Sequence, residues 1–110
     1  MATSKEYIEF VCDHIRGLGD IRYKKMFGEY LMYIDQKPLL MVCDNTVFVK
    51  KLDCVANLMN GAGCGFPYEG AKEHYILDIE DHELCESVIR TLWEVVPLPK
   101  QKRKAAEKGV

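Results

Sequence analysis

The sequence has no long hydrophobic segment. Its longest uninterrupted apolar run, residues 39–43, is far shorter than the roughly 20 residues that a membrane-spanning helix needs. Residues 1–6 contain no basic segment that leads into an apolar one, so no secretory signal is expected. Both absences predict a protein of the cytoplasm.

The cysteines form no recognisable motif. They are odd in number, and no two have C-x-x-C spacing: Cys12, Cys43, Cys54, Cys64 and Cys85. Three of them fall on predicted apolar stripes, where a thiol acts as a small hydrophobic side chain. We expect buried, reduced thiols and no disulfide framework, as is usual in a reducing cytosol.

No set of catalytic residues is apparent. Cys64 lies in a glycine-rich loop and His74 follows ten residues later, which superficially suggests a nucleophile and its base. Such a pair needs proximity, a lowered thiol pKa and a third group that orients the base. The sequence indicates none of these, so it predicts no catalytic residues and no enzymatic activity.

Phosphate-binding and metal-binding motifs are also missing. Gly61, Gly63 and Gly65 do not join a strand to a helix and are not followed by Gly-Lys-Ser/Thr. They indicate a helix end and a turn-rich loop. The histidines His14, His74 and His82 have no ligand spacing with one another or with the cysteines, so no metal and no cofactor is expected. His14 and His82 lie on predicted helices and are expected to be solvated, whereas His74 alternates with apolar residues in the predicted strand over 74–79.

Charge is distributed unevenly along the chain. The 110 residues, 48% hydrophobic and 29% charged, suit one globular domain. Residues 100–110 have five basic residues against Glu107 alone, whereas residues 1–99 have ten basic and sixteen acidic residues. We predict a compact acidic domain over 1–99 and a flexible basic tail over 100–110. The basic tail either makes weak contact with nucleic acid or only increases the solubility of the protein, and the sequence does not decide between these alternatives.

Hydrophobic periodicity predicts the secondary structure. Thr3 and Glu6 have capping-box spacing ahead of a helix over about 4–16, which Gly17 ends. Strands are predicted over 21–26, 29–34, 39–43, 46–50 and 74–79, a short helix over 52–59, and a long helix that ends before Pro97. The order α-ββββ-α-β-α with short turns predicts an α+β fold of two layers, an antiparallel sheet packed by helices.

Two of the predicted strands are apolar on both faces. Residues 29–34 place Leu31 and Tyr33 on one face and Met32 on the other, because consecutive side chains of a strand point in opposite directions. One layer of helices covers only one of these faces. The sequence therefore predicts an exposed apolar face that binds a second copy or a regulatory protein.

A basic cluster precedes these strands at Arg22, Lys24 and Lys25. By the two-residue period of a strand, Arg22 and Lys24 share a face. They favour either contact with phosphate or an acidic partner, or a solvated edge strand whose charges prevent aggregation.

Several motifs resemble the TfoX/Sxy N-terminal-domain family. They include Leu18-Gly19-Asp20, Lys25-Met26-Phe27-Gly28, the loop Phe66-Pro67-Tyr68-Glu69-Gly70-Ala71-Lys72, and Leu92-Trp93 in the last helix. The similarity extends over residues 4–97. The chain departs from the family pattern at Glu29, where a second glycine is common, and at Asp35-Gln36, where Asp-Gly is common.

The resemblance implies a secretion-chaperone-like α+β fold, in which sheets or helices commonly form dimers, and no catalytic residues. Larger members of the family are bacterial regulators of natural competence (DNA transformation) that act with a transcription activator, and this chain resembles a short stand-alone member without their C-terminal helical domain. We therefore expect a non-enzymatic regulatory or adaptor domain, with a ligand-binding or nucleic-acid-binding module as the alternative. The expected interaction residues are Arg22, Lys24, Lys25, Met26, Phe27, Gly28, Leu31, Tyr33, Lys100, Lys102, Arg103 and Lys104.

Overall fold

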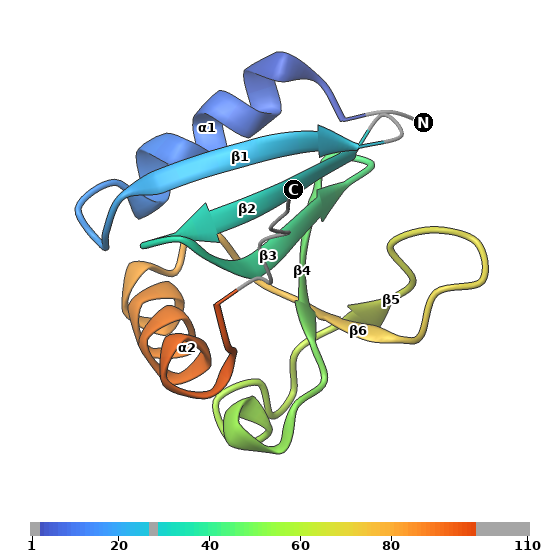
Figure 1. Cartoon of the computed structure of the whole chain (residues 1–110). Helices are drawn as coiled ribbons and strands as arrows, with labels where there is room; N and C mark the ends of the chain where they lie inside the picture. Colours follow the sequence, from blue (N-terminus) through green and yellow to red (C-terminus); the bar gives the residue numbers. More distant parts are fainter. Residues whose placement is uncertain (1–2, 27–28, 99–110) are drawn as a thin grey trace, which may run out of the picture.

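The computed structural model describes residues 3–26 and 29–98, which form an α+β fold (Figure 1). Within this part of the chain, no helix is long and apolar enough to cross a membrane. The elements are α1 (Lys5–Ile15), β1 (Ile21–Met26), β2 (Glu29–Ile34), β3 (Lys37–Cys43), β4 (Thr46–Lys50), the 3-10 helix η1 (Asp53–Val55), β5 (Cys64–Gly65), β6 (His74–Ile76) and α2 (His82–Val95).

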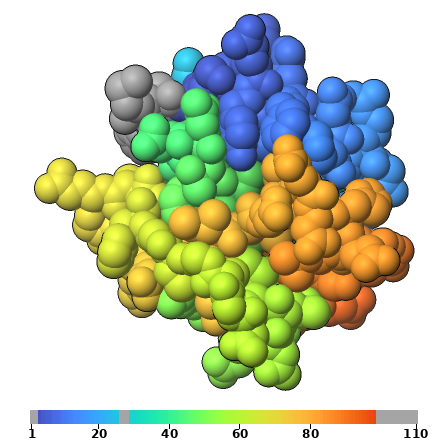
Figure 2. Space-filling model, turned by 180° about the vertical axis from the view of Figure 1, so that it is seen from behind, coloured from blue at the N-terminus to red at the C-terminus, as the bar shows by residue number. Residues whose placement is uncertain are grey.

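The strands form one antiparallel sheet in the order β1-β2-β3-β4-β6-β5. Both helices pack on the same face, and they lie next to each other when the molecule is seen from behind (Figure 2). The predicted class, an antiparallel sheet packed by helices in two layers, is therefore confirmed.

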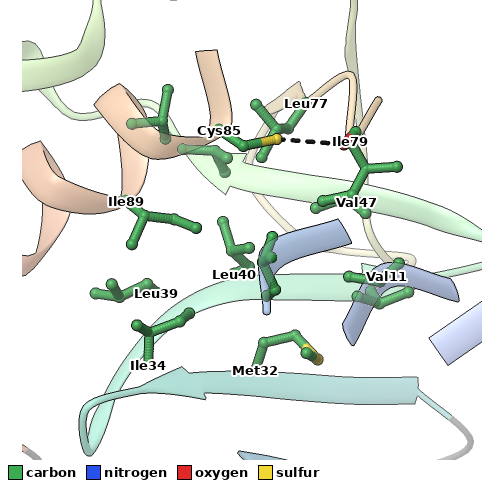
Figure 3. Packing of buried hydrophobic residues seen from close by; sticks show 14 of the residues in the cluster. Val11, Met32, Ile34, Leu39, Leu40, Val47, Leu77, Ile79, Cys85 and Ile89 are labelled. Carbon is green, nitrogen blue, oxygen red and sulfur yellow. Dashed lines mark hydrogen bonds between the residues drawn. The ribbon is translucent and has the colours of Figure 1, made fainter. Parts of the chain in front are cut away.

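The hydrophobic core lies between this face of the sheet and the two helices (Figure 3). Met32 of β2 is fully buried there, together with Val11 of α1 and Ile89 of α2. The Cys85 thiol of α2 donates a hydrogen bond to the Ile79 carbonyl, with 3.6 Å between Sγ and O. Residues 77–79, predicted as part of a strand, lie beyond β6, but Leu77 and Ile79 still contribute buried side chains.

Two hairpins have the two-residue turns that the right-handed twist of paired strands favours. Asp35 and Gln36 join β2 to β3, and Asp44 and Asn45 join β3 to β4, all four with positive φ between 49° and 74°. The first turn is shorter than predicted: Lys37 already pairs with Ile34, so β3 begins two residues before position 39.

The predicted capping box at Thr3 is wrong. Ser4 is the N-cap of α1, since its side chain accepts a hydrogen bond from the Tyr7 amide. Thr3 is instead buried, and its hydroxyl lies 3.4 Å from the Val42 carbonyl oxygen and 3.2 Å from a Glu29 carboxylate oxygen. Thr3 thus ties the start of α1 to the sheet, which is a tertiary contact that local spacing does not reveal.

The predicted helix over 52–59 is also wrong. The segment contains only η1 and then turns, although Val55 and Met59 are buried as expected. The glycine-rich loop that follows includes a short strand, β5, that the sequence did not predict. A two-residue strand is too short to show an alternating pattern, and its pairing with β6 defines it.

Candidate functional site

The face of the sheet opposite the helices, here called the outer face, has a row of side chains across it that is apolar from β2 to β6 and ends in a lysine on β1. Lys24, Leu31, Met41, Phe48 and Ile76 lie directly opposite one another on neighbouring strands β1, β2, β3, β4 and β6. Along β2, burial alternates strictly: Tyr30, Met32 and Ile34 are buried, whereas Glu29, Leu31 and Tyr33 are half-buried. The sequence predicted that Leu31 and Tyr33 share a face opposite Met32, and in the structure their face is the less covered one.

Basic side chains lie at one edge of the outer face. Arg22 is opposite Tyr33 and Lys24 is opposite Leu31, so both belong to this face, whereas Lys25 is opposite Tyr30 on the helix side. The Arg22 guanidinium also pairs with Asp20 at 3.0 Å, with both side chains largely exposed. An ion pair this exposed contributes little to stability, so these charges are available to a partner.

Of the other predicted interaction residues, Met26 belongs to the edge strand β1. The backbone of Met26 pairs with Glu29 at the end of β1. Outside the described residues lie Phe27, Gly28, the tail residues Lys100, Lys102, Arg103 and Lys104, and the predicted boundary between domain and tail.

A cavity of about 350 Å³ lies where β3 and β4 separate. The two strands pair only from Met41 opposite Phe48 to Cys43 opposite Thr46, so the first half of β3 and the end of β4 have no pairing with each other. Residues 96–98, which follow α2, contribute to the wall beside this opening. The cavity has a mostly hydrophobic lining: Leu31, Pro38, Leu39, Leu40, Met41, Phe48, Lys50, Leu52, His74, Leu92, Val96, Pro97 and Leu98.

The polar side chains of the cavity come from β4 and β6. Lys50 and His74 are directly opposite each other in the register of these strands. Only 8% of His74 is exposed. Its Nδ1 lies 2.7 Å from the Lys72 carbonyl oxygen, and its ring meets Phe48 edge to face at 6.3 Å between centroids. The site therefore combines an apolar wall with one cationic and one imidazole side chain, a composition typical of small-molecule pockets.

Cys64 and His74 are not brought together. Cys64 pairs with Tyr75 in the β5–β6 register and Gly65 pairs with His74, so the thiol and the imidazole lie on opposite faces. Lys51 and Glu73 form an ion pair near Cys64, with 2.7 Å between Nζ of Lys51 and Oε1 of Glu73. The hydrogen bond to the Glu73 carboxylate raises the pKa of Lys51. The structure thus provides no base for the Cys64 thiol at His74.

Glycine in this loop has a packing reason. A Cβ atom at Gly65 would lie 3.3 Å from the Phe48 ring, closer than most real contacts allow. Gly65 therefore lets β5 approach the wall of the cavity. Within the described ranges, the loop leads into a strand and not into a helix, so it lacks the geometry of a phosphate-binding loop.

The remaining candidates for metal or thiol chemistry are dispersed. Among the described residues, no group of three or more His, Cys, Asp or Glu side chains converges on a metal position. His14 is half-buried and its ring packs at a tilt of 48° against Phe10, with 4.2 Å between the ring centroids, contrary to the solvated position predicted for it, whereas His82 is exposed. All five cysteines are free.

Burial dominates the chemistry of the thiols inside the protein. It raises the pKa of Cys43 to about 12, with the nearby Glu29 carboxylate adding to the effect, and the pKa of Cys85 to about 11. Burial also raises the pKa of Cys12. Because these thiols stay protonated near neutral pH, they are poor nucleophiles. Cys64 alone among the five is exposed.

Sequence reasoning missed the cavity. The signal available was His74 in an alternating strand, which indicated that one face of the strand contains a histidine. The sequence does not show whether another segment covers that face, because a histidine in an alternating strand can lie on a solvated or on a buried face. Lys50 and residues 96–98 gave no signal, since their proximity to His74 depends on the divergence of β3 and β4.

These features define the chain as a small α+β domain with a partly exposed apolar sheet face. None of the known protein-family models matches it. The chain is similar to an uncharacterized 12.7 kDa protein encoded in the trpE 5′ region of Spirochaeta aurantia, with 34% identity over 105 residues that cover 94% of this chain and 91% of that protein. The chain therefore belongs to the same family as the Spirochaeta aurantia protein.

Proposed function

We propose that the protein is a non-enzymatic regulatory or adaptor domain that acts through protein contacts and forms a homodimer through its outer face. The observation that supports this is the exposure of Leu31, Tyr33 and Met41, all half-buried, on a face opposite both helices. Adjacent apolar side chains of this kind commonly mark an interface. A symmetric dimer uses one patch twice and needs no second gene product.

The basic edge supports the same proposal. Arg22 and Lys24 flank Tyr33 and Leu31 on the outer face, and polar rims around an apolar centre are typical of protein interfaces. In a dimer or a complex with an acidic regulator, these charges would select orientation and speed association.

The resemblance to the TfoX/Sxy N-terminal-domain family gives the proposal its biological direction. It rests on the motif Lys25-Met26-Phe27-Gly28 and on Leu18-Gly19-Asp20. On this basis we propose a cytoplasmic bacterial domain that contributes to the regulation of transcription, with competence as the process to examine first.

The dimer is tested by sedimentation of three lysine variants. Leu31→Lys should produce monomers that unfold cooperatively, because two charges would face each other across the interface. Met32→Lys should prevent folding, because Met32 is fully buried. Val95→Lys is the matched control: Val95 is 55% exposed at the end of α2, and its replacement should leave the dimer intact. A wild-type protein that remains monomeric at high concentration would refute the dimer.

A further inference from the structure

We propose that the cavity between β3, β4 and residues 96–98 binds a small phenol, whose ring fills the apolar part and whose hydroxyl contacts His74 and Lys50. This inference does not rest on the homodimer, because a single copy of the chain forms the cavity. Leu31 and Met41 border both the cavity and the exposed part of the outer face.

The size and lining of the cavity limit the ligand to a small apolar molecule. About 350 Å³ is at the lower end of the volumes found for ligand pockets. The wall is formed by aliphatic side chains such as Leu39 and Leu92 and by the ring of Phe48. A single aromatic ring with a short substituent is suited to such a space, and Phe48 offers it an aromatic contact.

His74 provides a hydrogen-bond acceptor. Because a carbonyl oxygen only accepts, Nδ1 must donate the hydrogen bond to Lys72. In the neutral ring this leaves Nε2 without a proton, as an acceptor. Among the described residues Nε2 has no hydrogen-bond partner, although only 8% of His74 is exposed. A buried polar atom without a partner is costly, and a ligand that brings a donor removes this cost.

Lys50 provides a donor beside it. Side chains directly opposite each other on antiparallel strands have Cβ atoms about 5 Å apart, so one ligand atom is within reach of both Lys50 and His74. No carboxylate among the described residues pairs with Lys50, whereas its neighbour Lys51 pairs with Glu73 at 2.7 Å. A hydroxyl is the simplest group that donates to one side chain and accepts from the other.

The ligand has a route from solvent. Leu98, in the wall formed by residues 96–98, is 58% exposed. This part of the wall therefore borders solvent, and a small molecule can enter without any opening of the core between the sheet and the helices.

The test is titration calorimetry of the full-length protein with two isomeric probes, 4-ethylphenol and 4-methylanisole. The isomers have the same atoms, but only the phenol has a donor. We expect 4-ethylphenol to bind about tenfold more tightly, the factor that corresponds to one hydrogen bond. Amide NMR shifts should locate the binding to β4, β6 and residues 96–98.

Two variants and one control complete the design. His74→Phe should abolish the preference for 4-ethylphenol over its isomer, and Lys50→Met should reduce it. Lys51→Met changes the same residue type at the adjacent position on the opposite face and should leave it unchanged. Equal affinity for the two isomers, an unaltered preference in His74→Phe, NMR shifts at another surface, or no binding of either probe would each overturn the proposal.

Discussion

At the scale of single residues, the two hairpin turns show how this sequence accepts local strain. Type I′ turns need positive φ at both central positions, which suits Asn, Asp and Gly. The second turn uses Asp44 and Asn45, whereas the first places Gln36 at φ 74°. Glutamine has no short polar side chain that compensates in the left-handed region. Gln36 is therefore the most strained of the four turn residues.

Gln36→Gly should stabilise the protein. Glycine removes the steric cost of positive φ, although it also increases the entropy of the unfolded chain, so we expect a net gain of about 0.5 kcal/mol in the free energy of unfolding. Asn45→Gly is the matched control and should change stability less, since asparagine tolerates φ 54°. Urea unfolding measures both variants. A loss of stability in Gln36→Gly would contradict the strain argument.

At the scale of elements, the end of α2 is attached to the β2–β3 turn. The indole Nε1 of Trp93 donates to the Asp35 carbonyl oxygen at 3.3 Å. The ammonium group of Lys37 donates to the Trp93 carbonyl oxygen at 2.7 Å and lies 3.7 Å from the centroid of the indole ring. A lysine at a helix C-terminus satisfies a carbonyl that has no partner within the helix. Residues 96–98, which line the cavity, follow directly after this attached end of α2.

Lys37→Met should therefore weaken the attachment. It removes one charge-assisted hydrogen bond and one cation–π contact at a partly exposed site, which predicts a loss of about 1 kcal/mol in the free energy of unfolding. Trp93 is the single tryptophan of the chain, so its fluorescence emission should also shift. Lys72→Met, at another exposed lysine, is the control and should change neither quantity. Unaltered emission in Lys37→Met would refute the contact.

At the scale of the whole molecule, the thiols connect the core to pH. Cys43 and Cys85 are fully buried, one on the sheet and one on α2. Their pKa values are raised from an ordinary value near 9 to about 12 and about 11. Between the ordinary pKa near 9 and the raised pKa of each thiol, the unfolded chain releases the proton of that thiol and the folded chain retains it. Stability is therefore unaffected by these groups below pH 9 and falls as the pH rises above it.

The free energy of unfolding should decrease from about pH 9 to about pH 11 under reducing conditions. Urea unfolding at a series of pH values measures this dependence. Other groups also titrate in this range, so the informative comparison is the variant Cys43→Ala, whose profile should be shallower than that of the wild type. Parallel profiles would show that the Cys43 thiol ionises as readily in the folded chain as in the unfolded one.

The sequence alone determined the elements whose signal is local. Both faces of residues 29–34 are apolar, so the sequence separated Met32 from Leu31 without determining which of them meets the helices. Helical periodicity located both helices, because burial on one face of a helix leaves a repeating pattern. Short or irregular segments left none: η1 has three residues and β5 has two. For that reason the helix predicted over 52–59 was wrong and β5 was missed.

Only the tertiary structure decided the rest. Thr3 has the local signature of a helix cap, yet it contacts Val42, 39 residues away. His74 alternates with apolar residues in its predicted strand, a pattern that does not show what covers it, yet the packing of Phe48 and the divergence of β3 from β4 place it in the wall of a cavity. Local patterns report which face of an element is apolar. They do not report which distant segment covers that face, because this depends on how the strands separate and where α2 ends.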